Sequence, residues 1–143
     1  MRIASLAGFL LMVSALVGLV FMHALFSRSL VVVAVQVAAV ALVVWARLAL
    51  GRRSFHPAAD VAGGELVTTG PYRFIRHPIH TAACVFCWAG ILANFALMPF
   101  AAGLLLLIGA VIRVFAEERL LLDRYPGYRK YAKGTKRMVP YLF

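Results

Sequence analysis

The sequence predicts an all-α integral membrane protein with four transmembrane helices, a cytoplasmic loop and an interfacial helical tail near the C-terminus. The first observation is composition: 64% of the 143 residues are hydrophobic and only 14% are charged, too little polar cover for a water-soluble domain. The second is a set of four apolar runs that approach the roughly 20 residues needed to cross a bilayer. The third is that the basic residues gather at the ends of these runs.

The first two apolar runs comprise residues 3–26 and 30–50. The first is longer than the ~7–15 apolar residues of a secretory signal, and the second follows after a very short polar break. We therefore expect an uncleaved helical hairpin. In the second run, Gln36 is expected to hydrogen-bond to a neighbouring helix, while Trp45 and Arg47 stand where a membrane interface would begin.

Residues 51–70 form the longest polar segment, which is too short for a separate domain and whose glycines and prolines predict turns. Two further apolar runs follow, residues 79–98 and 99–116, and their uncharged connection predicts a tight hairpin. The character of the chain changes at Glu117. From there we expect the last helix to continue into the interface until Pro126 and the following glycine stop it.

The charge distribution predicts the orientation of the chain in the membrane. With four spans, thirteen of the fifteen Lys and Arg residues fall on the side that both termini share. The positive-inside rule assigns that side to the cytoplasm. Beyond Pro126, tyrosines alternate with basic residues, as is typical of an element that lies on anionic lipid. Lipid headgroups thus account for the net charge of +10, and no nucleic-acid partner is expected.

A polar segment rich in arginine, proline and histidine, residues 70–80, separates two apolar parts of the chain. Pro78 directly precedes the third apolar run, where proline is favoured as a first helical residue. A helix beginning there would direct its unpaired N–H groups and its positive dipole end toward His77 and Arg76, an arrangement that receives anionic groups. The alternative is a basic loop that only determines topology.

A second polar cluster lies at the end of the fourth run. Arg113 and Glu117 are four residues apart and share one helix face. An ionisable residue at membrane depth indicates function, although an ordinary anchoring ion pair is the alternative. Because antiparallel neighbours bring the start of the third span beside the end of the fourth, we expect a pocket lined by Arg, His, Tyr and Glu side chains that opens to the cytosol.

The sequence offers little sign of metal or redox chemistry. Its two cysteines, Cys84 and Cys87, are three residues apart inside an apolar run and share a helix face. No further soft ligands stand nearby in the sequence, which favours a packing role. We therefore expect no metal site.

Several short motifs, in order and at consistent spacing, resemble the signature of the isoprenylcysteine carboxyl methyltransferase and phospholipid methyltransferase superfamily. They are Leu66-Val67-Thr68-Thr69-Gly70-Pro71-Tyr72, Arg76-His77-Pro78, Glu117-Glu118 with Leu121, and an ending with Tyr128, Tyr131 and Val139-Pro140. The resemblance covers residues 45–143. That superfamily binds S-adenosylmethionine without a Rossmann domain, and the sequence has no G-x-G-x-x-G unit of that kind.

The resemblance implies roles for individual residues. Arg113 would be catalytic and would face the methyl acceptor. The cofactor-binding residues would be Leu66, Val67, Tyr72, His77, Pro78, His80 and Glu117. Two positions depart from the superfamily pattern, because His80 stands where tyrosine is usual and Ala82 where glycine is usual. Both departures lie at the expected cofactor wall.

The resemblance also implies one membrane methyltransferase domain, residues 1–143, with a transmembrane hairpin (1–50) and a cofactor-binding part (51–143). The methyl donor would be S-adenosylmethionine. The acceptor would be lipophilic or membrane-delivered: an isoprenylcysteine-like carboxylate, a phospholipid amine or a small thiol. We expect a multi-pass protein of a bacterial inner membrane. The alternatives are a superfamily member with an altered reaction, a four-helix transporter and a structural membrane protein.

Overall fold

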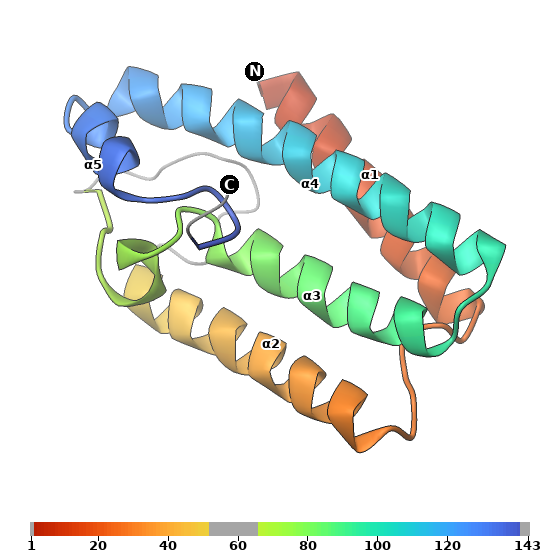
Figure 1. Ribbon diagram of the computed structural model, residues 1–143. Coiled ribbons are helices and arrows are strands. Elements are labelled where there is room, and N and C mark those ends of the chain that lie inside the picture. The colour runs from red at the N-terminus through yellow and green to blue at the C-terminus, as the bar shows by residue number, and fades with distance from the viewer. Residues whose placement is uncertain (1, 52–65, 141–143) are drawn as a thin grey trace.

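The computed structural model describes residues 2–51 and 66–140, and these residues form five α-helices and one short 3₁₀ helix (Figure 1). The elements are α1 (Arg2–Phe21), α2 (Leu30–Leu50), η2 (Gly70–Arg73), α3 (Pro78–Ala93), α4 (Leu97–Arg124) and α5 (Tyr128–Gly134). No strand occurs in this part of the chain beyond one isolated bridge between Ile75 and Lys136. The all-α prediction is confirmed.

Three of the described helices, α1, α2 and α4, are long and apolar enough to cross a membrane. The sequence predicted four spans, but α3 is shorter than a typical span, because it has only 16 residues and a rise of about 24 Å. This helix begins at Pro78, as predicted, but ends at Ala93 rather than Met98. Asn94 ends it: the Asn94 side-chain amide donates to the carbonyl oxygens of Phe26 and Gly90, both at 3.0 Å.

Two other helix boundaries differ from the sequence prediction. Helix α1 ends at Phe21 instead of Phe26, and His23 there has a positive φ of 52°. Helix α4 begins at Leu97, so that the turn between the last two apolar helices lies before Pro99. The far end of α4 is as predicted, since the helix continues past Glu117 to Arg124. At 1.5 Å per residue, Glu117 lies about 30 Å from the start of α4, one hydrocarbon thickness away.

Helices α1 and α4 cross in direct backbone contact. A Cβ atom added to Gly8 would lie 2.7 Å from the carbonyl oxygen of Gly109, and one added to Gly109 would lie 2.8 Å from that of Gly8. Small residues permit such close approach between membrane helices. Figure 1 shows the two helices side by side, and the N-terminal half of α1 consequently lies against Arg113, whose guanidinium is 5.0 Å from the ring centroid of Phe9.

Helix α2 packs on α3, and Gln36 makes the contact predicted for it. Its amide donates to the carbonyl oxygen of Phe86 in α3 at 3.3 Å and to that of Leu25 at 2.6 Å. Helix α3 also packs on α4 through a buried core that includes Ile91 and Leu106. Helix α3 therefore stands between α2 and α4 (Figure 1).

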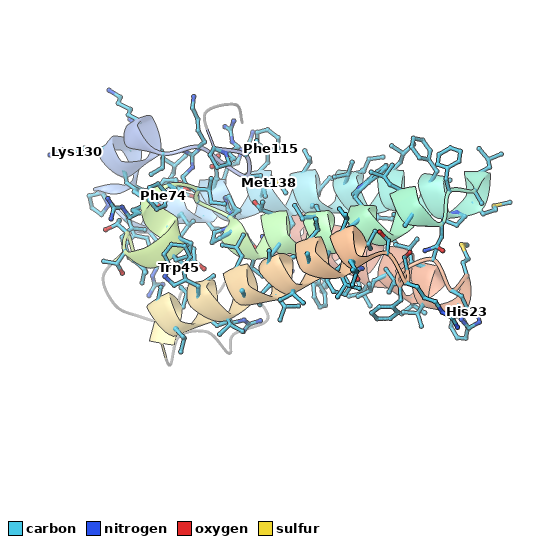
Figure 2. The ribbon with its side chains drawn as sticks, turned by 60° about the horizontal axis from the view of Figure 1, so that its bottom comes forward. His23, Trp45, Phe74, Phe115, Lys130 and Met138 are labelled. Carbon is cyan, nitrogen blue, oxygen red and sulfur yellow. The ribbon has the colours of Figure 1, made fainter. Side chains whose placement is uncertain are left out.

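The polar elements gather at one end of the helices. Figure 2 shows Trp45, Phe74 and Lys130 at that end and His23 at the opposite one. At the polar end, η2 packs against the last turns of α2, where a Cβ atom added to Gly70 would lie 3.0 Å from the Ala49 Cβ atom. Gly70 also has a φ of 60°, a conformation that glycine adopts without strain.

The segment that follows α5 runs beside the residues that precede α3. The backbone N–H of Arg76 donates to the carbonyl oxygen of Lys136 at 2.7 Å, and that of His77 donates to Arg137 at 2.9 Å. The Thr81 hydroxyl, in the first turn of α3, donates to the carbonyl oxygen of Met138 at 2.7 Å. The C-terminal tail is thus part of the wall around the start of α3.

Candidate active site

The two polar clusters found in the sequence meet in the structure. The Arg113 Nε atom lies 2.7 Å from Glu117 Oε1, one helical turn along α4. From the start of α3, His77 Nδ1 lies 3.4 Å from Glu117 Oε2, and His80 Nε2 lies 3.9 Å from Glu117 Oε1. We call these four residues the Glu117 cluster. All four side chains are at most 16% exposed, so their charges act on one another with little screening by water.

The beginning of α3 explains why the two histidines point at one carboxylate. Pro78 occupies the first turn of α3 and lacks an N–H group, and His77 precedes the helix with a non-helical ψ of 57°. His80 follows three residues later, so its ring lies edge-on to that of His77 with centroids 5.7 Å apart. The two rings therefore form one wall of the Glu117 cluster.

The neighbouring carboxylate, Glu118, organises a second set of contacts. Arg76 Nε donates to Glu118 Oε1 at 2.7 Å, and Arg137 Nε donates to Glu118 Oε2 at 2.8 Å. The Arg76 Nη1 atom donates further to the carbonyl oxygens of Ala132, at 2.8 Å, and of Thr135. We call Arg76, Glu118, Thr135 and Arg137 the Glu118 cluster. It joins α4, α5, the tail and the segment before α3.

The sequence places Glu118 in a motif and Arg76 among the groups that would receive an anion, but it predicts no contact between the two. The signal was present, however, because consecutive residues of a helix project about 100° apart, so two adjacent acids face largely different neighbours. A pair of glutamates at a helix end thus predicts two separate sets of partners. Which basic residues supply those partners depends on the path of the tail.

The electrostatics of His77 reflect both carboxylates. Burial by itself would lower the pKa of His77, but the facing carboxylates of Glu117 and Glu118 outweigh it and raise this pKa above 6.5. The Nε2 atom of His77 is fully buried and has no hydrogen-bond partner among the described residues; Glu118 Oε1 lies 3.7 Å away. This atom is an unsatisfied buried polar group.

Tyr72, in η2, and Pro78, at the start of α3, are both buried. Pro78 is less than 2% exposed and Tyr72 is 9% exposed. Burial raises the pKa of the Tyr72 phenol, and the neighbouring Tyr131 acts in the same direction. The Tyr131 hydroxyl donates to the backbone carbonyl of Tyr72 at 2.6 Å and fixes η2 against α5.

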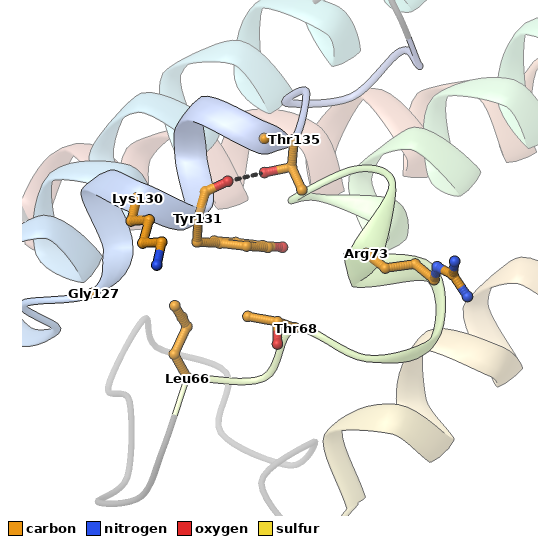
Figure 3. Close-up of a pocket in the computed structure, with 8 residues that line it drawn as sticks. Leu66, Thr68, Arg73, Gly127, Lys130, Tyr131 and Thr135 are labelled. Atoms are coloured by element: carbon orange, nitrogen blue, oxygen red, sulfur yellow. Dashed lines mark hydrogen bonds between the residues drawn. The ribbon is translucent and has the colours of Figure 1, made fainter.

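Leu66 lines a different space, a cavity of about 450 Å³ between η2 and α5 (Figure 3). Its lining residues are Leu66, Thr68, Arg73, Gly127, Lys130, Tyr131, Gly134 and Thr135. Figure 3 shows Leu66 and Thr68 on one side and the ring of Tyr131 on the other. Val67 is not among the lining residues. The structure thus brings together Arg113, Glu117, His77 and His80, whereas Leu66 lines a separate cavity.

A family model described as phospholipid methyltransferase matches residues 28–127, which are 100 of the 143 residues and include the whole Glu117 cluster. The chain belongs to the phospholipid methyltransferase family. This confirms the superfamily resemblance that the motifs indicated. Neither a curated protein nor a solved structure matches the chain. The matched region contains η2, α3 and α4 but ends before α5, so the tail contacts of Glu118 lie outside it.

Membership of this family and three long apolar helices make the chain a membrane protein of a methyltransferase family. The residues present suit a methyl donor that carries a positive sulfonium. The half-buried carboxylate of Glu117 and the buried aromatic ring of Tyr72 are groups that accommodate cations. The unpaired Nε2 atom of His77 offers a polar contact beside them.

Proposed function

We propose that the chain is an S-adenosylmethionine-dependent methyltransferase that acts on a lipophilic or membrane-delivered acceptor. The observation that carries the proposal is the Glu117 cluster, in which the first turn of α3 and the polar end of α4 face each other inside the family-matched region. S-adenosylmethionine would supply an electrophilic methyl group, and its displacement requires little from the protein beyond alignment of donor and acceptor.

In this proposal most of the site holds the cofactor. Glu117 and Tyr72 face its cationic part, and the two histidines and Pro78 form the adjoining wall. Leu66 and Val67 cover it from the segment before η2. The 450 Å³ cavity beside Leu66 is large enough for a small-molecule group. In this proposal the cofactor extends from the cluster toward this cavity, which is lined by Tyr131, whose hydroxyl donates to the backbone carbonyl of Tyr72.

Arg113 has the second role, that of positioning the acceptor. It lies one turn before Glu117 in α4, and its guanidinium packs over the ring of Phe9 in α1. A guanidinium there orients an anionic acceptor such as a carboxylate or thiolate, neither of which needs a strong base. An amine acceptor would have to lose a proton, and His77 or His80 would accept it.

The proposal includes an orientation in the membrane, which rests on the distribution of basic residues. We propose that α3 is a fourth, short span, because its first turn meets the polar end of α4. The positive-inside rule would assign these two ends to the cytoplasmic surface. Both termini then face the cytoplasm, as expected of a bacterial inner-membrane protein. Reporter fusions after Phe143 and near Ser27 should report opposite sides; the same side for both would contradict the span number.

Titration calorimetry tests the function directly. The purified protein in nanodiscs should bind S-adenosylmethionine and its demethylated product, each with a stoichiometry of one. Folded protein that binds neither compound at concentrations up to about 1 mM would exclude the proposal. His23→Gln, at the opposite end of the helices, is the matched control and should bind the cofactor like the unaltered chain.

A further inference from the structure

The Glu117 cluster has a property that methyl transfer does not require. One nitrogen of His77, one nitrogen of His80 and one oxygen of Glu117 all lie within 4.8 Å of one another. The two histidine-to-carboxylate contacts, at 3.4 and 3.9 Å, are longer than the roughly 2.7–2.9 Å of a charge-assisted hydrogen bond. Three buried or half-buried side chains thus point toward one common space, and neither histidine makes a short hydrogen bond to Glu117.

We propose that His77, His80 and Glu117 bind a divalent transition-metal ion of the zinc class. Two imidazoles and one carboxylate are a ligand set that Zn²⁺ accepts, at bond lengths of about 2.0–2.2 Å. Ligand atoms of such a tetrahedral ion lie about 3.3 Å apart. The distance of 3.4 Å between His77 Nδ1 and Glu117 Oε2 already matches this spacing. His80 Nε2 lies 3.9 Å from the other oxygen, Oε1, and the three donor groups, which lie within 4.8 Å of one another, would close on one ion through small side-chain rotations.

The surroundings of His77 provide an independent argument. A histidine that ligates a metal almost always donates its other ring N–H to a carboxylate or carbonyl, which orients the ring. When His77 Nδ1 faces Glu117, its Nε2 atom is left over, buried and without a hydrogen-bond partner in the described chain. The acceptor nearest to that role is Glu118 Oε1 at 3.7 Å, which Arg76 and Arg137 hold in place.

The position of Arg113 determines which carboxylate oxygen is used. Its Nε atom holds Glu117 Oε1 at 2.7 Å, so the ion takes Oε2, the oxygen on the His77 side. The guanidinium also repels a cation. The dissociation constant for zinc should therefore be on the order of 1 μM rather than the much lower values of structural sites. Three protein ligands leave one coordination position for water or another small ligand.

The ion and the methyl donor would compete, a consequence that rests on the proposed function because both use His77, His80 and Glu117. Zinc binding itself does not depend on that function. It can be measured on the chain without any cofactor.

The test is calorimetric titration of tag-free, chelator-treated protein in nanodiscs with zinc chloride alone. One ion per chain should bind, whereas magnesium chloride, a hard cation that prefers oxygen ligands, should not. His80→Gln and His80→Tyr should each weaken zinc binding at least about ten-fold. His23→Gln and the double variant Cys84→Ser/Cys87→Ser, which alters the only cysteines, are matched controls and should bind as the unaltered chain does.

Two results would overturn the proposal. The first is the absence of stoichiometric zinc binding up to about 100 μM. The second is zinc binding that survives in both folded His80 variants or disappears in the cysteine double variant. Zinc binding together with a complete lack of S-adenosylmethionine binding would support the metal site and contradict the proposed function. S-adenosylmethionine binding without zinc binding would support the proposed function and contradict the metal site.

Discussion

Glu117 and Glu118 are consecutive residues of α4, yet their side chains lie in different surroundings. Both oxygens of Glu118 accept short bonds from arginines, at 2.7 and 2.8 Å, and both arginines connect it to other segments. Glu117 has one short contact, to Arg113, and its two histidine contacts are 3.4 and 3.9 Å long. A carboxylate with saturated short contacts stabilises the fold, whereas one with open contacts is available to a ligand.

The largest expected effect comes from removing the saturated carboxylate. Glu118→Ala leaves Arg76, 8% exposed, without its charged partner, and breaking a buried ion pair costs about 3 kcal/mol in the free energy of unfolding. Thermal unfolding in detergent and proteolysis of the tail after Gly134 measure it. Glu117→Ala is the matched variant and should lose less than half as much stability. If both variants lost the same free energy of unfolding, Glu118 would not stabilise the fold more than Glu117 does.

Next in size is the effect of Arg113→Ala on turnover. Loss of acceptor positioning should reduce methyl transfer at least about ten-fold, while cofactor affinity should stay within a few-fold of that of the unaltered chain. Single-turnover kinetics with saturating cofactor separate the two quantities. Cofactor binding abolished in the folded variant would mean that Arg113 and Glu117 act as one structural pair.

A smaller change of about ten-fold in cofactor affinity is expected for Glu117→Gln, which keeps the shape of the side chain but removes its charge. The cationic methyl donor loses a Coulombic partner in a poorly hydrated site. Calorimetric titration with S-adenosylmethionine measures the change. The demethylated product has an uncharged sulfur. Glu117→Gln should therefore lose less affinity for this product than for S-adenosylmethionine. An equal loss for both compounds would argue against a contact with the sulfonium.

The smallest effect concerns Tyr131, which lines the cavity and holds η2 against α5. Tyr131→Phe removes the hydrogen bond to the Tyr72 carbonyl and should cost about 1 kcal/mol in the free energy of unfolding. Burial raises the pKa of Tyr131 from 10.0 to about 12. The folded state therefore favours the protonated phenol, and this contribution is complete below pH 10 and disappears as the pH rises toward 12. The free energy of unfolding of the unaltered chain should therefore approach that of Tyr131→Phe between pH 10 and 12. A difference that stays constant over this range would contradict the prediction.

Much of this arrangement could be predicted from local sequence. The apolar runs, the helix start at Pro78, the extension of α4 past Glu117 and the bonding of Gln36 follow from composition, proline geometry and the cost of burying an amide. The predicted approach of His77 to Glu117 needed only the assumption that α3 and α4 are antiparallel neighbours.

Other features depend on contacts between residues far apart in the chain. The Gly8–Gly109 crossing, the early end of α3 at Asn94 and the docking of the tail on Arg76 and His77 are of this kind. Glycines in an apolar run do not reveal which helix they will touch, and Asn94 ends α3 because its amide reaches Phe26 in another connection. Val67 likewise matches a motif without lining the cavity beside it.

The docking of the tail has a consequence for biosynthesis. Because the backbone N–H groups of Arg76 and His77 are bonded by Lys136 and Arg137, the wall of the site is assembled from residues that the ribosome adds about sixty positions apart. The apolar helices can enter the membrane during translation while this wall is still open. A chain whose translation stops at Gly134 would therefore lack this part of the wall, and the binding of a ligand there would have to wait until residues 135–138 have left the ribosomal exit tunnel.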